Sequence, residues 1–207
     1  VAGAQTRRLL RWNAHKPGCQ HGGTQAASSV LSSFLDSRAK RYQTSISKPE
    51  DSRHHCSRLS PHLAWGNLSL RQTYHALKHR QSDGEWGRAL AAFESRLHWH
   101  CHFIQKFEME CRMEFEDLNR GYLAFPRRSD PERLDAWREG RTGYPLIDAA
   151  MRCLLQTGYI NFRSRAMLVS FLTHHLWQDW RTGATWLGSL FLDFEPGIHY
   201  PQMQMQA

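Results

Sequence analysis

The sequence predicts an all-α fold, a compact bundle of crossing helices, on three observations. Apolar residues recur at helical spacing along most of the chain. No stretch alternates polar and apolar residues with the period of a β-strand. The segment 166–177 is apolar almost all round, which is typical of a helix buried on most sides. No heptad repeat persists, so a coiled coil is excluded.

The helices are expected to follow one another with short polar breaks. Apolar repeats, capping residues before proline and glycines at the ends set their bounds. We expect helices over 24–42, 61–65, 70–80, 85–110, 131–139, 145–157, 161–180 and 182–192. The polar stretch 44–55, which contains Pro49, is expected to be a loop. Residues 1–23 are expected to link a missing N-terminal domain to a helical domain over 24–207 that is truncated at its C-terminal end.

Charge and cysteine content restrict the class of protein. Lys and Arg number 27 against 19 Asp and Glu, which leaves a net charge of +8 and favours a polyanionic partner or a phosphate-bearing cofactor. The five cysteines form no C-x-x-C pair, as expected in a reducing compartment. No apolar run is long enough to span a membrane. The sequence therefore predicts a soluble cytoplasmic protein without membrane association.

A candidate anion site lies in the stretch CSRLSP, residues 56–61. Its hydroxyls, its guanidinium and the free N–H groups of a helix start are the donors that an anion needs. The alternative is that Ser60 only caps the helix that Pro61 begins. On spacing alone, the capping interpretation is favoured.

A second candidate is the polar cluster that follows the corner at Gly158. Arg163 and Arg165 are two residues apart, so their side chains diverge by roughly 200° on a helix and one of them can face inward. An inward arginine needs an anionic partner, because an unpaired buried charge is prohibitive. Asp193 and Glu195 are the candidate partners. A purely structural ion pair and a ligand-holding pair both remain open.

Histidines and aromatic residues are dense in SRLHWHCHF, residues 95–103. His98 and His102 have a spacing that can grip a metal, but no acidic general base lies between them as in H-E-x-x-H. An aromatic wall beside a planar ligand, or plain core packing, is favoured. No metal site is predicted.

Four ordered motifs carry a resemblance to a known family. They are CSRLSPHLAWGNLSLRQ, SRLHWHCHF, TGYPLIDAAMR with TGYINFRSR, and SFLTHHLWQDWRTGATWLGSLFLDFE. On these motifs the chain is identified as a divergent, bacterial-type member of the photolyase/cryptochrome family, over about residue 24 to the C-terminus. The resemblance implies an α/β antenna domain followed by an all-helical domain that holds FAD folded in a U.

The resemblance also implies residue roles at the cofactor. Arg165 would pair with Asp193 beside the isoalloxazine ring, and His199 stands where the family usually has an Asn facing flavin N5. The full set of implied cofactor residues is Tyr42, Ser57, Arg58, Leu59, Ser60, Phe93, His100, Arg165, Asp193, Glu195 and His199.

The implied partner is UV-damaged DNA, and the expected state is a monomer. The resemblance places a lesion-binding and DNA-binding set at Arg96, Trp99, Asn161, Phe162, Arg163 and Met205. Trp180 corresponds to the middle member of the tryptophan chain that photoreduces the flavin.

Three departures from the family pattern bear on activity. The family's lesion-binding Glu is Arg96 here, and its W-x-W pair is Met203-Gln-Met205, which removes the flavin-proximal tryptophan. The HNR that usually follows the corner is Asn161-Phe162-Arg163. The implied function is a photolyase-like lyase that transfers an electron from photoexcited reduced flavin to a pyrimidine lesion. The alternatives are a cryptochrome-like photoreceptor without repair activity, and a basic helical module that binds nucleic acid without flavin.

Overall fold

The fold is all-α, as predicted. The structure is a computed structural model that describes residues 18–124, 127 and 129–207, and it contains no β-strand in these ranges. The N-terminal half comprises α2 (Thr24–Asp36), η1 (Arg38–Arg41), α3 (Tyr42–Ser45), α4 (Pro49–His55), α5 (Ser60–Ala64), α6 (Leu70–Ser82) and α7 (Gly87–Met109). The C-terminal half comprises η2 (Cys111–Glu114), η3 (Arg120–Tyr122), α8 (Pro131–Arg138), α9 (Pro145–Thr157), α10 (Phe162–Ser170), η4 (Phe171–His175), α11 (Trp180–Leu190) and α12 (Pro196–Gln206).

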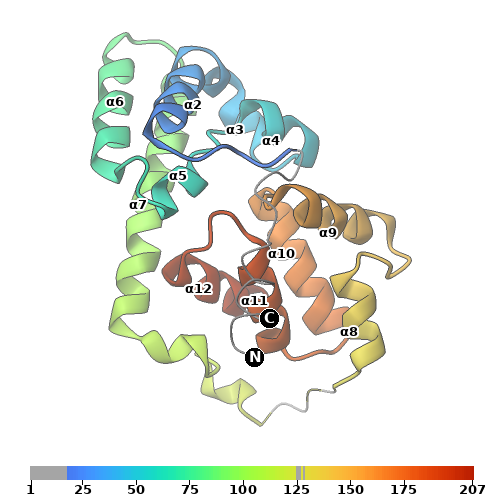
Figure 1. Cartoon of the computed structure of the whole chain (residues 1–207). Helices are drawn as coiled ribbons and strands as arrows, with labels where there is room; N and C mark the ends of the chain where they lie inside the picture. The colour runs from blue at the N-terminus through green and yellow to red at the C-terminus, as the bar shows by residue number, and fades with distance from the viewer. Residues whose placement is uncertain (1–17, 125–126, 128) are drawn as a thin grey trace, which may run out of the picture.

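Each half has its own hydrophobic core. Phe34, Leu77 and Leu90 are fully or almost fully buried in the N-terminal core, and Trp137 and Trp180 are fully buried in the C-terminal core. The long helix α7 runs along one side of the molecule and packs against α3 and α6 above and α12 below (Figure 1). Helix α7 therefore contributes to the N-terminal core and contacts the C-terminal half through α12.

Helix ends with strong local signals are where the sequence predicted them. Helix α9 begins at Pro145 and ends before Gly158, whose φ of 65° is the left-handed conformation that glycine adopts readily. The Ser69 hydroxyl accepts a bond from the N–H of Gln72 and forms a capping box at α6. The Asp130 carboxylate caps α8 by accepting a bond from the Arg133 N–H.

Two predictions in the N-terminal half are wrong. The expected helix 24–42 is interrupted at Ser37, where φ of −146° and ψ of −51° end α2 and begin the tight turn η1. The expected loop 44–55 contains α4, because Pro49 occupies the first helical turn with Glu50 and Asp51 behind it. Acidic residues near the N-terminus of a helix complement its dipole and stabilise even a short helix.

The expected helix 161–180 is also interrupted. Helix α10 gives way to the π-helical segment η4, and the chain then leaves the helix before α11 begins at Trp180 rather than Thr182. Trp177 lies in this break with φ of 59°, a conformation that β-branched and bulky residues rarely adopt. The apolar pattern of the sequence does not reveal this break, because the helices before and after it both carry buried apolar residues.

Helix α12 was not predicted. Its sequence contains Pro201 and no clear apolar period, yet it packs closely on α7. A side chain at Gly197 would place its Cβ 2.8 Å from the Cα of Ile104, so glycine is what lets the two backbones approach. The Glu195 carboxylate accepts a bond from the Gly197 N–H at the start of the helix.

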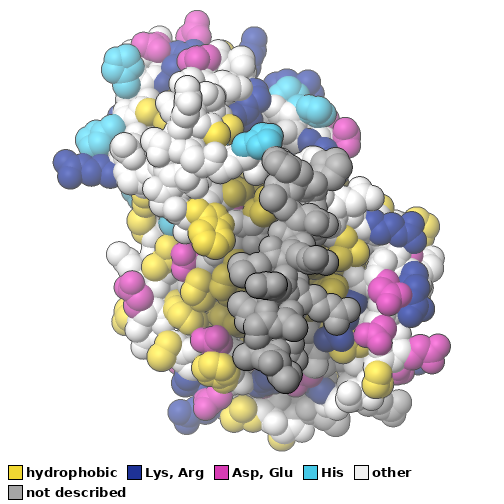
Figure 2. Space-filling view, in the orientation of Figure 1, with side chains coloured by type: hydrophobic (Ala, Val, Ile, Leu, Met, Phe, Trp, Pro, Cys, Tyr) yellow, Lys and Arg dark blue, Asp and Glu magenta, His cyan; other side chains and the backbone are white. Residues whose placement is uncertain are grey.

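The predicted linker 1–23 lies mostly outside the described residues. Its described end is attached to the N-terminal half through Gly23, whose N–H donates to the Asn67 side chain at 2.9 Å. No helix in the described ranges is both long enough and apolar enough to cross a membrane. Figure 2 shows apolar side chains between the two halves, and mixed acidic and basic side chains over α8 and α9.

Candidate cofactor and substrate site

Asp193 is the centre of the candidate site. Nη2 of Arg165 lies 2.9 Å and 2.8 Å from its two carboxylate oxygens. The Asp193 side chain is 4% exposed and that of Arg165 is 19% exposed, so the ion pair is largely withdrawn from water. The Ser60 hydroxyl donates to the same carboxylate at 2.6 Å. The predicted inward arginine and its predicted partner are therefore in contact.

The N-terminus of α10 orients this arginine. The Asn161 side chain caps the helix by accepting a bond from the Ser164 N–H at 3.0 Å, and Arg165 follows one turn later. Its Nε donates to the Ile160 carbonyl at 3.0 Å, which fixes the guanidinium. Arg163 is exposed, so the two arginines diverge as the helical spacing predicted.

The capping interpretation of Ser60 is wrong. Leu59 is the N-cap position of α5, and Ser60 already lies within the helix. Its hydroxyl is used for Asp193 rather than for a backbone N–H of its own helix. This hydrogen bond ties the stretch 57–60 to the ion pair.

A cavity of about 400 Å³ opens between α7, α10 and α12. Nine of the predicted cofactor and lesion residues line it: Tyr42, Ser57, Arg96, Trp99, His100, Asn161, Phe162, Arg163 and Met205. No Asp or Glu is among its lining residues, whereas two arginines are. The cavity thus combines aromatic walls with positive charge, a combination suited to an anionic aromatic ligand.

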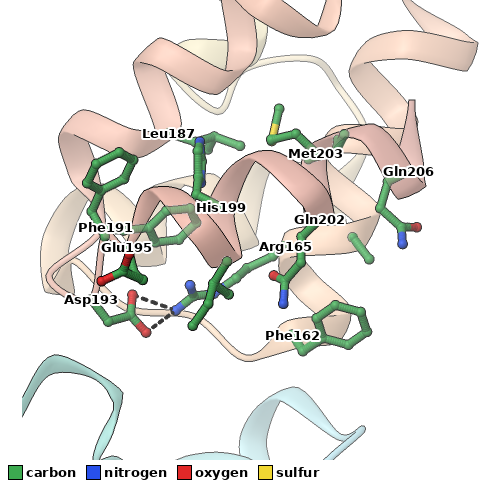
Figure 3. A pocket seen from close by; sticks show the side chains of 14 residues that line it. Phe162, Arg165, Leu187, Phe191, Asp193, Glu195, His199, Gln202, Met203 and Gln206 are labelled. Carbon is green, nitrogen blue, oxygen red and sulfur yellow. Dashed lines mark hydrogen bonds and ion pairs between the residues drawn. The ribbon is translucent and has the colours of Figure 1, made fainter. Parts of the chain in front are cut away.

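A smaller pocket adjoins this cavity and contains the ion pair. It is lined by Arg165, Asp193, Glu195 and His199, and Phe162, Ile198 and Gln202 line both spaces. Figure 3 shows Phe162, Arg165 and Asp193 along one edge and Leu187, His199 and Met203 along the other. The tertiary structure therefore gathers most of the predicted site into two connected spaces.

An unsatisfied buried atom supports a polar ligand in the cavity. Nδ1 of His100 is buried and has no hydrogen-bond partner in the part of the chain that the structure describes. Burial lowers the pKa of His100, so the ring is neutral at pH 7. A ligand that offers a hydrogen bond to His100 would satisfy this atom. The residues present fit a phosphate-bearing aromatic cofactor.

Other predicted site residues lie outside both spaces. Leu59 and Phe93 belong to the N-terminal core, where the Phe93 ring packs edge-on at 4.7 Å from Phe34 and 5.7 Å from Tyr42. They shape the wall behind the cavity. The Arg58 guanidinium stacks on the Tyr159 ring at 3.8 Å and lines a different cavity.

Trp180 is fully buried and belongs to a charged network. Its indole N–H donates to Oδ1 of Asp117 at 2.8 Å, and the guanidinium carbon of Arg181 lies 4.8 Å from the centre of its ring. Arg127 and Arg181 also donate to Asp117. Burial raises the pKa of Asp117, but hydrogen bonds from Trp180, Arg181 and Arg127 outweigh it and the pKa is lowered.

Two supporting residues were missed by sequence reasoning. Asp117 lies in a mixed segment without periodicity, and nothing local links it to Trp180. Arg38 donates to the carbonyls of Cys56, of Ser57 at 3.3 Å and of Val30 at 2.9 Å. It thereby holds the start of the 57–60 stretch. In sequence it belongs to a basic run, SRAKR, which is typical of solvated surface.

His199 is neutral and is held in place by the backbone. Its Nε2 lies 2.9 Å from the carbonyl oxygen of Ala184, and the residue is 8% exposed. Burial lowers the pKa of His199 to about 4, and this effect outweighs the backbone bond to Ala184, which raises the pKa; the positive charge of Arg165 lowers it by a smaller amount. The ring is turned toward α11 and away from the ion pair (Figure 3).

Comparisons with known proteins identify the family of this chain. Residues 93–207 match the family model described as the FAD binding domain of DNA photolyase. The chain is 34% identical over 177 residues to a deoxyribodipyrimidine photo-lyase of Halobacterium salinarum, covering 84% of this chain and 36% of that protein. It is 37% identical over 145 residues to a cryptochrome DASH of Synechocystis sp., covering 67% and 28% respectively. A bacterial class III photolyase structure from Agrobacterium tumefaciens has a TM-score of 0.85 at 31% identity, covering 89% of this chain and 38% of that one.

The fold and the site thus define an all-helical flavin-binding domain whose cofactor is FAD. The chain belongs to the photolyase/cryptochrome family. It spans about a third of the length of the curated relatives named above.

Proposed function

We propose that this domain works in a light-driven flavoprotein that transfers an electron to a pyrimidine lesion in DNA. The observation that carries the proposal is the buried Arg165–Asp193 pair beside the lined cavity. When bound, FAD supplies the light-driven one-electron chemistry. The protein supplies position, fixed charge and exclusion of water.

Each side of the site has a separate task in this proposal. Arg165 presents fixed positive charge beside the ring system, and Asp193 keeps that charge in place. Ser57, Ser60 and His100 would hold the phosphates. Glu195, half-buried at the start of α12, would face the ribityl chain. FAD retention by the Asp193→Asn variant tests this arrangement, and loss of flavin absorption is expected.

The cavity mouth would accept the flipped lesion. Trp99, Phe162 and Met205 line the cavity and are 46%, 42% and 61% exposed, so three large apolar side chains are open to solvent at one place. Apolar faces of this kind stack on bases that have left the duplex. Arg96 and Arg163 line the same cavity and would meet phosphates, in keeping with the net charge of +8.

Light-dependent loss of pyrimidine dimers from irradiated DNA tests the repair activity. The purified, flavin-loaded protein is illuminated with damaged DNA, and dimers are counted against a dark control. Trp99→Ala is expected to reduce both binding and repair, whereas Met109→Ala, at an exposed methionine that ends α7 outside the cavity, is expected to change neither. Dimers that persist in the light while flavin remains bound would rule out repair.

A photoreceptor without repair activity is the second candidate. It is favoured by Met203, which is 2% exposed and lines the smaller pocket where the family has a tryptophan. A thioether is harder to oxidise than an indole, so electron supply through this position is weakened. A flavin that changes redox state in blue light, in a protein that leaves dimers intact, would assign this function.

Trp180 is the proposed electron donor of this chain. The negative charge of Asp117 beside its indole would stabilise the positive charge left on the ring after oxidation. Trp180→Phe is expected to slow flavin photoreduction. Trp137→Phe is the matched control, because Trp137 is equally buried and its indole N–H donates to the Leu168 carbonyl instead of a carboxylate. Unchanged photoreduction in Trp180→Phe would redirect the route to Trp177, Trp186 or a tyrosine.

A further inference from the structure

A second cavity, of about 230 Å³, lies between α4 and α9. Tyr159 and Asn161 line both this cavity and the cofactor cavity, so the two spaces adjoin. The second cavity is not among the spaces assigned above to the flavin or to a lesion. We propose that it binds the phosphate group of a small organic phosphate through Arg53 and Arg58.

Arg58 is held rigidly at this cavity. Its Nε donates to Oε1 of Gln20 at 3.1 Å, and Nε2 of Gln20 donates back to the Arg58 carbonyl at 2.8 Å. Its φ of 60° is a left-handed conformation that costs a residue with a Cβ about 1 kcal/mol. Residues with a strained backbone conformation of this kind are concentrated at functional sites. The guanidinium is therefore fixed before any ligand arrives.

The charge of Arg58 has no carboxylate within ion-pair distance among the described residues, and Asp193 acts on it only from farther away. None of the ion pairs within residues 18–124, 127 and 129–207 includes it. Its guanidinium donates to the Gln20 side chain, and its flat face covers the Tyr159 ring. Burial lowers the pKa of the Arg58 guanidinium. A partly buried guanidinium without a carboxylate is costly, and a bound anion would offset that cost.

Arg53 brings a second positive charge to the same cavity. Its Nη2 contacts the Cys153 sulfur at 2.8 Å on the α9 side. The Arg53 charge acts on Arg58 and lowers its pKa, which places the two guanidiniums within electrostatic reach of each other. Glu50 is the acidic residue on the lining, 3.9 Å from Arg53, and its side chain is 82% exposed. A phosphate in this cavity could accept charge-assisted hydrogen bonds from both guanidiniums.

The opposite wall indicates an organic substituent on the phosphate. Leu146, Ala149 and Ala150 line it from α9, and their side chains carry no polar atom. The ligand chemistry is thus a phosphate monoester with an apolar or flat substituent. Inorganic phosphate would bind only the two arginines. A nucleoside monophosphate would bind the arginines with its phosphate and contact the apolar wall with its nucleoside.

Calorimetric titration tests the proposal on the flavin-loaded chain, in which FAD occupies the cofactor cavity. The probes are inorganic phosphate, adenosine monophosphate and an undamaged DNA duplex, at constant ionic strength. Saturable binding of the monophosphate is expected, with phosphate weaker. Arg53→Gln is expected to weaken both by about tenfold, the loss typical of one charge-assisted contact. Ala149→Phe, which leaves every charge in place and fills the cavity, is expected to abolish monophosphate binding.

Arg71→Gln is the matched control, because Arg71 is an exposed arginine on α6 away from this cavity. An equal loss in Arg53→Gln and Arg71→Gln would overturn the proposal, since net charge alone would then explain it. Absence of saturable binding, or binding of the duplex alone, would also overturn it. FAD absorption, recorded on each variant, reports the proposed function independently, because neither Arg53 nor Ala149 lines the cofactor cavity.

Discussion

The Ser60 hydroxyl donates a 2.6 Å hydrogen bond to Asp193, across 133 residues of sequence. Ser60 lies at the start of α5 in the N-terminal half, and Asp193 lies between α11 and α12 in the C-terminal half. The same carboxylate receives Arg165. One acidic residue therefore joins the two halves of the domain at the candidate cofactor site.

A double-mutant cycle on Ser60 and Asp193 measures this connection. Ser60→Ala is expected to lower the free energy of unfolding by about 1 kcal/mol, the usual net value of a hydrogen bond. Asp193→Asn is expected to cost about 3 kcal/mol, because Arg165 is left largely buried without its carboxylate. In the Asp193→Asn background the effect of Ser60→Ala should be smaller, because a neutral amide oxygen is a weaker acceptor than a carboxylate. Urea unfolding supplies the four free energies.

Ser69→Ala is the control for that cycle. Ser69 is a true cap, with its hydroxyl accepting from the Gln72 N–H at 3.1 Å. Its replacement is expected to cost about 1 kcal/mol in both the wild-type and the Asp193→Asn backgrounds. Additive behaviour of Ser60→Ala would show instead that its hydroxyl acts within its own helix.

Asp117 is predicted to be essential for the packing of Trp180. Asp117→Asn keeps the shape of the side chain but removes the charge that Arg127 and Arg181 share. A loss of about 3 kcal/mol in the free energy of unfolding is expected, because Asp117 is 6% exposed. Near-ultraviolet circular dichroism of the tryptophans should change as well. Asp135→Asn removes the carboxylate of an exposed pair with Arg138 and should cost less than about 1 kcal/mol.

His199 is predicted to make stability depend on pH in mild acid. Its pKa of about 4 in the folded chain lies below the ordinary value of 6.5 in the unfolded chain. Between these values the unfolded state binds more protons, so stability falls as pH falls from 6.5 to 4. The loss amounts to at most about 3 kcal/mol from this group. His100 and His62, whose pKa values burial also lowers, act in the same direction.

His199→Asn is expected to flatten this pH dependence without removing it. Denaturant unfolding at pH 7 and pH 4.5 gives the two free energies to compare. His75→Asn, at an exposed position of α6, should leave the pH dependence unchanged. An equally steep loss in wild type and His199→Asn would contradict the assignment of a neutral, buried imidazole.

Gly183 is predicted to be required for the contact of α11 with η4. A Cβ at this position would overlap Cδ2 of Leu172 and lie 3.3 Å from the Trp137 ring. Gly183→Ala is therefore expected to destabilise the protein by about 1–3 kcal/mol, even though alanine favours the helix. Gly87→Ala, where no atom lies within 4 Å, should cause no loss. Thermal unfolding of both variants tests the difference.

The sequence determined those features whose cause lies within a few residues. The bounds of α9 follow from Pro145 and Gly158, which act on the backbone next to them. The divergence of Arg163 and Arg165 follows from helical geometry alone. The family motifs indicated which residues would surround a cofactor, and most of those residues do line two connected spaces.

The tertiary structure decided which partner each polar group meets. Ser60 had a local use as a cap, but Asp193 takes its hydroxyl instead. Asp117 and Trp180, 63 residues apart, carry no shared pattern in the sequence. Helix α12 forms without a clear apolar period, because α7 supplies the surface on which it packs. A buried polar group must find a partner wherever the folded chain brings one, and the distance along the chain places no limit on that choice.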